Sequence, residues 1–331
     1  MRIWSKHIKE TLRDIEEFML DEYKLARNEE EKKRDWRTYE QRLAYRIKGA
    51  IRNLEPLIGE AVSTIKVRRE KGRKPALTLE QKVTLLLLKQ LIEKSNRNMS
   101  FMIDIFSIFS GIDISYKTVE RLYSDPEVEM ALHNLHILIL KKKGIKDVDA
   151  TGDGTGYSLI VRKHYASETK KRKEKVKSNG KEKKAFVYSF KLMDLDTLLY
   201  VCYGASLKSE KEAFDRAMIM LPDTEVRINS VRLDKYYSFP TYVDKFGEAT
   251  VYIIPRKDAT LKGSWKWKRT MFEFIKDTIP YMMEYYRRNH SEADFSADKR
   301  GFGWKVGQKR EDRINTATVC TALWHNLFNL Y

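Results

Sequence analysis

Apolar residues recur at helical spacing through the first part of the chain. Between residues 3 and 67 they stand three or four positions apart among charged side chains, with no strand-like alternation, as in Ile8, Leu12, Ile15, Phe18 and Met19. This spacing is typical of amphipathic helices that bury one face. We therefore expect residues 1–75 to form a charged, all-α N-terminal region.

The next segment, residues 76–143, carries helix start signals. Thr78 and Gln81 stand three positions apart before the apolar run VTLLLLKQLIEK, which matches the capping box of a helix start. A second helix is expected to begin at Ser115 and to be closed by Pro126. The short helices around SGIDISYKTVERLY form a candidate helix-turn-helix, which would either enter a DNA groove or pack within the helical region.

After Gly144 the pattern changes from helices to a mixture of strands and helices. Segments rich in Val, Ile, Tyr and Phe predict strands in DVDATGDGTGYSLIV, KAFVYSFKLMDLDTLLYVCYGAS, EVRINSVRLD and ATVYIIPRK. Helical spacing returns in SEKEAFDRAMIML and in residues 271–292. Strands interspersed with helices indicate an α/β domain, which we expect to span residues 144–331.

Net charge narrows the class of partner. The chain has 331 residues, 42% of them hydrophobic, and can bury a substantial core. Lysine and arginine outnumber aspartate and glutamate by 64 to 47, for a formal net charge of +17. This excess favours a polyanion such as nucleic acid. The alternative, a thermophilic surface laced with ion pairs, requires balanced signs.

Other sequence features bear on the compartment. Cys202 and Cys320 are too few for a disulfide framework or a thiolate metal site. No apolar run approaches the length of a membrane span, and the N-terminal MRIWSKHIKETLRD lacks the apolar core of a signal peptide. The sequence predicts a cytoplasmic protein with no membrane partner.

A strongly basic segment separates the first two expected strands. Residues 170–184, KKRKEKVKSNGKEKK, contain Val176 as their one apolar residue and predict a basic hairpin tip. Such a tip is either a solubilising loop or a clamp on a phosphate backbone.

Aspartates follow the expected strands. Asp234 comes directly after the strand-like run in INSVRLDKYYS, and Asp153 ends the run in DVDATGDGTGYS, where Asp149 stands four positions earlier. The ends of strands in open α/β sheets are where functional groups gather. A single aspartate in such a place is more often a turn or cap residue, so these positions alone do not define a site.

Helical spacing places four polar side chains on one face of a helix expected over residues 281–299. Tyr285, Arg288, Glu292 and Lys299 lie at offsets that fall within roughly a 60° sector at about 100° per residue. Periodicity alone favours a solvated face for these residues.

Motif spacing changes that interpretation. The spacing of Tyr285, Arg288, Glu292 and Lys299 resembles the Y-(2)-R-(3)-E-(6)-K signature of the DDE transposases of prokaryotic insertion sequences. LDKYYS is similar to that family's second-aspartate motif, although Tyr236-Tyr237-Ser238 stand where an Asp-Ser ending is common. DGTGYS is similar to the first-aspartate motif, and TATVCTALWHNLFNLY, which contains Asn326, to the terminal helix. The likeness covers roughly residues 76–331.

The resemblance implies a fold and a chemistry. It implies a ribonuclease H-like catalytic core, with Asp153, Asp234 and Glu292 holding two Mg²⁺ ions, or Mn²⁺ in their place. Asp153 is favoured over Asp149 as the first ligand because more positions after it match the motif.

The expected partner is double-stranded DNA, as transposon inverted-repeat ends and as target DNA, bound by a homodimer that pairs two ends. The resemblance implies that Lys299 and Arg288 bind phosphates and that Tyr285 hydrogen-bonds or stacks there. Trp265 and Trp267 lie between basic residues in KGSWKWKR, where they would stack on DNA or pack in the core.

Two other functions remain open at this point. One is a transposase-derived DNA-binding protein without catalysis, which the presence of all three carboxylates disfavours. The other is a ribonuclease H-like nuclease without strand transfer, which fold alone does not distinguish from a transposase.

Overall fold

The computed structural model describes most of the chain, in the ranges 4–16, 35–66, 76–92, 103–104, 107, 113–159, 186–308 and 310–331, without the side chains of Trp36 and residues 290–294. The basic segment 170–184 lies outside these residues. So does the first helix of the candidate helix-turn-helix.

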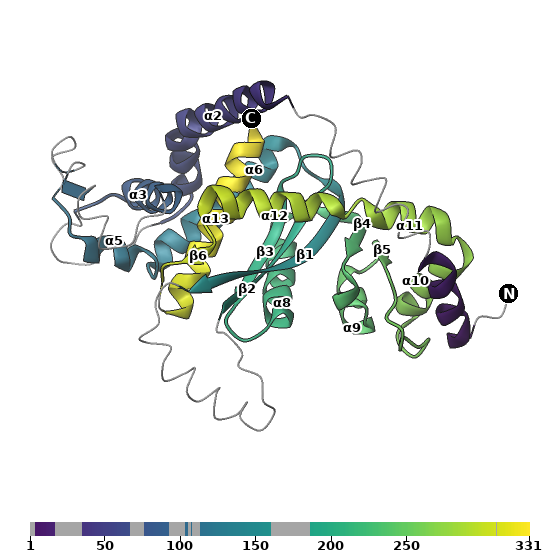
Figure 1. Cartoon of the computed structure of the whole chain (residues 1–331). Helices are drawn as coiled ribbons and strands as arrows, with labels where there is room; N and C mark the ends of the chain where they lie inside the picture. The colour runs from purple at the N-terminus through teal and green to yellow at the C-terminus, as the bar shows by residue number, and fades with distance from the viewer. Residues whose placement is uncertain are drawn as a thin grey trace.

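A mixed sheet occupies the centre of the molecule (Figure 1), with strands in the order β3-β2-β1-β4-β5. Three strands form an antiparallel meander, β1 (Asp147–Leu159), β2 (Phe186–Asp194) and β3 (Tyr200–Ser206). Parallel to β1 run β4 (Arg227–Leu233) and β5 (Thr250–Ile253), while β6 (Lys305–Val306) pairs with the far end of β1. The strands predicted from the four segments rich in Val, Ile, Tyr and Phe are confirmed.

Helices cover both faces of the meander. Phe190 and Lys191 are consecutive in β2 and therefore point to opposite faces. Phe190 packs against Phe214 of α8 (Glu210–Met220), with ring centroids 4.9 Å apart. Lys191 contacts Asp298 of α12 (Asn289–Phe302). Helices α8 and α12 therefore lie on opposite faces, and α8 packs so closely that a Cβ on Gly204 would lie 2.1 Å from a backbone oxygen.

The helical region packs on the sheet through the terminal helix α13 (Glu311–Leu330). It comprises α2 (Trp36–Ser63), α3 (Leu79–Ile92), α5 (Tyr116–Leu122) and α6 (Pro126–Lys143). One hydrophobic cluster contains buried residues of α2, α3, α6, the sheet and α13. The helical front and the α/β part therefore share a core. The boundaries at residues 75 and 143 stay predictions.

Local sequence signals predicted one helix start correctly and misplaced the role of one proline. The capping box is confirmed, because Thr78 N donates to Gln81 Oε1 at 2.9 Å and Gln81 N donates to Thr78 Oγ1 at 3.3 Å. The role given to Pro126 is wrong: α5 ends before it, and Pro126 opens α6 behind the cap formed by Asp125. Proline fits the first turn of a helix because its missing N–H has no partner there.

Side chains of two helices cap the edge strand β3. The amide of Asn326 in α13 accepts from Tyr200 N at 2.8 Å and donates to Tyr200 O at 2.9 Å. Nε2 of His136 in α6 lies 2.8 Å from Val201 O, and burial lowers the pKa of His136 to about 4. Neutral His136 therefore donates to that carbonyl. Asn326, which belongs to a motif of the sequence, joins the terminal helix to the sheet.

The N-terminal helix, residues 5–16, lies at the opposite end of the molecule from α2, beside α10 and α11 (Figure 1). Leu261 N donates to Ser5 Oγ at 3.2 Å, and Ile15 is buried in a cluster with Phe274 and Tyr285. The remaining elements of this end are η2 (Lys235–Tyr237), α9 (Pro240–Val243), η3 (Asp244–Phe246), α10 (Trp265–Lys276) and α11 (Thr278–Tyr286). The short η1 (Leu221–Thr224) follows α8 and contacts α6 and β3 instead.

Candidate active site

Asp153 and Asp234 lie on neighbouring parallel strands. The pairing of β1 with β4 ends at Gly152 opposite Leu233, and each aspartate is the next residue along its chain. Because adjacent strands are about 4.8 Å apart, the two carboxylates lie at the same end of β4. The prediction that Asp153 ends a strand is wrong, since β1 continues to Leu159 by pairing with β2 and β6.

One guanidinium contacts both aspartates. Arg288 Nη1 lies 3.6 Å from Asp153 Oδ2, and Arg288 Nη2 lies 3.2 Å from Asp234 Oδ1. The side chains of Arg288 and Asp153 are 16% and 17% exposed, so the pair is largely shielded from water. Two carboxylates on one cation have oxygens that converge on a common point. Phosphate binding by Arg288 stays a prediction.

The turn after β4 orients Asp234. Asp234 caps η2, where its Oδ2 accepts a hydrogen bond from Tyr236 N at 3.0 Å. Its other oxygen faces Arg288. The segment DKYYS therefore fixes the carboxylate through one oxygen and leaves the second directed toward Arg288, which also contacts Asp153.

Gly154 lies directly against the side chains of Glu210 and Tyr237. A Cβ at this position would lie 2.2 Å from Glu210 Oε1 and 2.9 Å from the hydroxyl oxygen of Tyr237. Tyr237 donates to Glu210 Oε1 at 2.6 Å, and burial raises the pKa of Glu210. Sequence reasoning missed Glu210, because its position after Ser209 at the start of α8 is explained by helix capping alone.

The single helix predicted over residues 281–299 is wrong, because α11 and α12 are separate. In a continuous helix Arg288 N would donate to Glu284 O. Instead it donates to Tyr285 O at 3.2 Å, and Glu284 O accepts from Arg232 Nε at 3.1 Å. A side chain from β4 thus competes for the carbonyl at the break. The residues of the signature therefore come from two helices and the turn between them.

Tyr285 and Lys299 lie against aromatic or cationic neighbours. Tyr285 is buried, its ring centroid lies 5.4 Å from the Arg288 guanidinium, and burial raises its pKa. Lys299 Nζ lies 5.5 Å from the ring centroid of Tyr157 and 5.1 Å from that of Trp304. Burial lowers the pKa of Lys299, and the nearby Lys191 adds to the effect. Contacts of these two residues with DNA stay predictions.

Asp149 lies in a different ion cluster. It is opposite Ser230 in the ladder and accepts a hydrogen bond from the Ser230 hydroxyl. Arg232 Nη1 lies 3.8 Å from Asp149 Oδ1, and Arg232 Nη2 pairs with Glu284 of α11. Arg232 is 2% exposed. Asp149 therefore joins β1 to α11 through Arg232 and lies on the paired part of the strand, away from Asp234.

A cleft of about 900 Å³ opens beside Asp234. Five cations and two carboxylates are among its lining residues, which are Lys9, Leu12, Arg13, Glu16, Asp234, Lys235, Ile254, Lys257, Tyr285, Tyr286 and Arg288. Lys9 and Arg13 come from the N-terminal helix. No site residue was predicted in this helix, because helical spacing gives no sign of which distant residues a helix packs against.

The two tryptophans of KGSWKWKR differ in exposure. Trp265 begins α10 and is 80% exposed. Trp267 is 2% exposed, and its indole N–H donates to Thr260 O at 2.7 Å. The structure places Trp267 in the core, which was one of the two interpretations of the sequence, and leaves the ring of Trp265 accessible.

The donors present fit two ligands of a hard divalent cation. Asp153 and Asp234 provide carboxylate oxygens that converge on one positive group, and Mg²⁺ prefers oxygen ligands. Glu292 belongs to α12, but its side chain lies outside the described part of the structure. Within that part, no group of three or more His, Cys, Asp or Glu side chains is arranged to hold a metal ion.

Comparison with known proteins decides the family. No protein-family model matches the chain. The probable transposase for insertion sequence element ISA1214 of Archaeoglobus fulgidus is 40% identical over 328 residues, which cover 99% of this chain and 97% of that relative. The chain belongs to the transposases of prokaryotic insertion sequences. The resemblance inferred from the motifs is confirmed at this level.

The similarity includes the N-terminal helix of the transposase. Because it spans nearly the whole of both chains, it extends over the residues that contribute Lys9 and Arg13 to the cleft. Of the helices within the described ranges, none has the length and apolar character needed to cross a bilayer.

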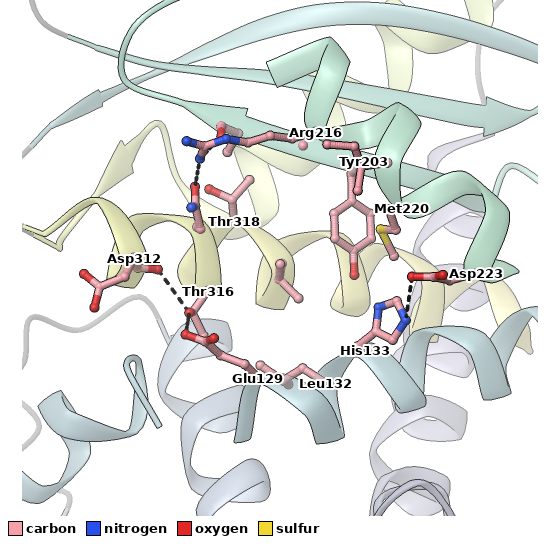
Figure 2. Close-up of a pocket in the computed structure, with 15 residues that line it drawn as sticks. Glu129, Leu132, His133, Tyr203, Arg216, Met220, Asp223, Asp312, Thr316 and Thr318 are labelled. Atoms are coloured by element: carbon pink, nitrogen blue, oxygen red, sulfur yellow. Dashed lines mark hydrogen bonds and ion pairs between the residues drawn. The ribbon is translucent and has the colours of Figure 1, made fainter. Parts of the chain in front are cut away.

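A second cavity of the transposase, of about 440 Å³, lies between α6, β3, α8 and α13 (Figure 2). Glu129 and His133 line it on one side and Tyr203 on the other, with the tyrosine ring directed inward. The buried Tyr203 hydroxyl has no hydrogen-bond partner among the described residues. None of the catalytic, metal-binding or DNA-binding residues predicted from the sequence lines this cavity, so the candidate chemistry is concentrated at the cleft beside Asp234.

Proposed function

We propose that this transposase is of the DDE type. It would bind transposon ends, hydrolyse a phosphodiester bond at each end, and join the freed 3′-hydroxyl to target DNA. The observation that carries the proposal is the pair of carboxylates, Asp153 and Asp234, on adjacent parallel strands with Arg288 between them, beside a cleft in which cations outnumber carboxylates by five to two.

The arrangement of elements supports a ribonuclease H-like core. In the fold that the resemblance implies, two aspartates lie on strands and a glutamate lies on a helix across the site. Here Asp153 lies in β1, Asp234 follows β4, and Glu292 belongs to α12, which contacts β1. The antiparallel meander followed by two parallel strands is compatible with that fold.

Asp153, Asp234 and Glu292 would hold the catalytic cations. Two divalent ions, Mg²⁺ or Mn²⁺, activate an attacking oxygen and stabilise a leaving oxygen in phosphoryl transfer. The role of the three side chains is to hold carboxylate oxygens in place before DNA binds. Asp234 is suited to this because its turn fixes one oxygen through Tyr236 N.

The reaction needs two displacements at phosphorus. In the first, a water oxygen bonds to phosphorus while the bond to the 3′ oxygen breaks, and that oxygen leaves as a hydroxyl. In the second, the hydroxyl oxygen bonds to a target phosphorus and gives its proton to solvent, while the bond to the target 3′ oxygen breaks and that oxygen takes up a proton and leaves as a hydroxyl. Arg288, beside both aspartates, would neutralise nonbridging phosphate oxygens during these steps.

The cleft would bind the DNA backbone. Lys9, Arg13, Lys235 and Lys257 line it together with Arg288. Lysine and arginine contacts to phosphates provide most of the affinity of proteins for duplex DNA. The exposed ring of Trp265 provides a further surface for stacking. A homodimer would pair two ends, with one cleft for each.

One assay tests the proposal against the alternatives. Purified protein is incubated with Mg²⁺ and duplex DNA that bears the inverted repeats flanking its gene. We expect strand-transfer products that disappear when EDTA is added. Nicks without joining would indicate a nuclease, and a mobility shift without cleavage would indicate a DNA-binding protein that does no chemistry. Either result contradicts the proposed function.

A further inference from the structure

A buried cluster of charged side chains lies next to the candidate active site. Lys191 Nζ is 2.6 Å from Asp298 Oδ2, and the Tyr200 hydroxyl donates to the same oxygen at 2.7 Å. Nδ1 of His325 is 2.8 Å from Asp298 Oδ1, and its Nε2 is 2.7 Å from Leu198 O. Lys191 is fully buried and Asp298 is 3% exposed. These residues come from β2, β3, α12 and α13.

The charges of this cluster hold one another in the ionised state. Burial alone would raise the pKa of Asp298, but Lys191 and His325 hold it well below its usual range. Burial would likewise lower the pKa of Lys191, but Asp298 and Tyr157 together outweigh burial and raise it. An ammonium therefore stays in the protein interior at neutral pH.

Lys191 is also a neighbour of Asp153. The two residues are directly opposite in the antiparallel ladder of β1 and β2. Directly opposite residues point to the same face, with Cβ atoms about 5 Å apart. The Lys191 ammonium therefore has two carboxylates within reach on that face, Asp298 and Asp153. In the structure it lies on Asp298.

A contribution to the stability of the fold does not explain such a cluster. A buried ion pair contributes little net stability, because desolvating both charges offsets their attraction. A pair of apolar residues would fill the same space without that cost. Its position suggests a different role, because a free ammonium opposite Asp153 would compete with a metal ion for that carboxylate.

We propose that Asp298 is a positioning residue that holds Lys191 away from Asp153, so that the Asp153 carboxylate is available to a divalent cation. The inference rests on the proposed function, in which Asp153 is a metal ligand. The contact also attaches α12 to β2 one residue before Lys299 and six residues after Glu292 on the same helix.

The test is the affinity of the full chain for Mn²⁺ without DNA, measured by the electron paramagnetic resonance signal of free Mn²⁺. Asp298→Asn should weaken binding by about 10-fold, the lower end of what loss of a partner of a metal ligand costs. Adding Lys191→Met to Asp298→Asn should restore the affinity to within about 3-fold of wild type, because the competing cation is gone. A merely structural role of Asp298 predicts no such reversal.

Two further variants serve as controls. Tyr200→Phe removes one hydrogen bond to Asp298 but leaves its ion pair with Lys191, so affinity should stay within about 2-fold of wild type. If Asp298→Asn does not fold, as judged by circular dichroism, Lys191→Met alone replaces it. That variant should bind Mn²⁺ at least as tightly as wild type, and weaker binding would overturn the proposal.

Other outcomes separate this inference from the proposed function. Unchanged affinity in folded Asp298→Asn, or failure of Lys191→Met to reverse its loss, overturns the inference and leaves the proposed function standing. If wild type does not bind Mn²⁺, or if Asp153→Asn does not reduce that binding, the inference and the proposed function are both contradicted.

Discussion

Asp149 and Asp153 are four residues apart on one strand and yet have different surroundings. Asp149 lies where β1 is paired with β4, accepts a hydrogen bond from Ser230 and contacts the buried Arg232. Asp153 lies just beyond that pairing, beside Asp234, with which it shares Arg288.

The partner strand accounts for the difference. Residues an even number apart on a strand point to the same face, so direction does not distinguish the two aspartates. The two aspartates differ because the pairing of β4 with β1 ends between them, at Gly152. Inside the paired region a carboxylate meets side chains of the neighbouring strand and joins elements together, whereas past its end a carboxylate meets the turn and the cleft.

The largest effect is expected at the end of the paired region. Asp153→Asn should reduce metal-dependent nicking of repeat-bearing DNA by about 10³-fold or more, because an amide lacks the charge that holds Mg²⁺. Asp149→Asn should stay within about 5-fold of wild type, because its partners lie on β4 rather than at the cleft. Initial rates of nicking measured at saturating Mg²⁺ compare the two.

Duplex binding serves as the control for both variants. It should be nearly unchanged, because lysine and arginine supply the affinity. An inactive Asp149→Asn beside an active Asp153→Asn would reverse the assignment of the first ligand.

A smaller effect, on stability, is expected at the cluster of Asp149. Arg232→Met should lower the free energy of unfolding by about 2 kcal/mol, below the range for breaking a fully buried pair, because Asp149 and Glu284 are 41% and 40% exposed. Urea denaturation gives the value. The matched control is Arg287→Met, whose half-exposed guanidinium also contacts Glu284 and should cost no more than about 0.5 kcal/mol. Equal losses would show that the burial of Arg232 is immaterial.

The smallest effect is expected for Ser230→Ala. It removes the hydroxyl that donates to Asp149 and should cost about 1 kcal/mol, the net value of one hydrogen bond. Nicking should be unchanged, because Ser230 contacts the cluster of Asp149 and not that of Asp153. A variant with full stability and impaired nicking would mean that the two clusters are coupled.

Local patterns predicted much of this architecture. Strands rich in β-branched and aromatic residues, the capping box at Thr78 and the position of Asp234 after a strand were all readable, because neighbours in the chain determine them. The break after α11 was not, because Arg232, some fifty residues earlier, takes the Glu284 carbonyl. Helical spacing does not show that a side chain of another element hydrogen-bonds a helix carbonyl.

Contacts between distant segments limited prediction of the site as well. Nothing in the spacing of residues 5–16 shows that Lys9 and Arg13 line the cleft of Asp234. The alternation of Trp and Lys in KGSWKWKR likewise did not show that Trp267 is buried while Trp265 is exposed. In both cases the partner surface, rather than the segment itself, decides which side chains are accessible.

The amide of Asn326 has a consequence for how the chain avoids self-association. An edge strand with free N–H and C=O groups is a template on which another chain can add a strand. On β3 the backbone N–H and C=O of Tyr200 are hydrogen-bonded to the amide of Asn326. The carbonyls of Val201 and Ala205 accept hydrogen bonds from His136 and Arg216. Until α13 docks, the part of this edge at Tyr200 is open to strand addition. A chain that lacks α13 would therefore be prone to aggregate through this part of the edge.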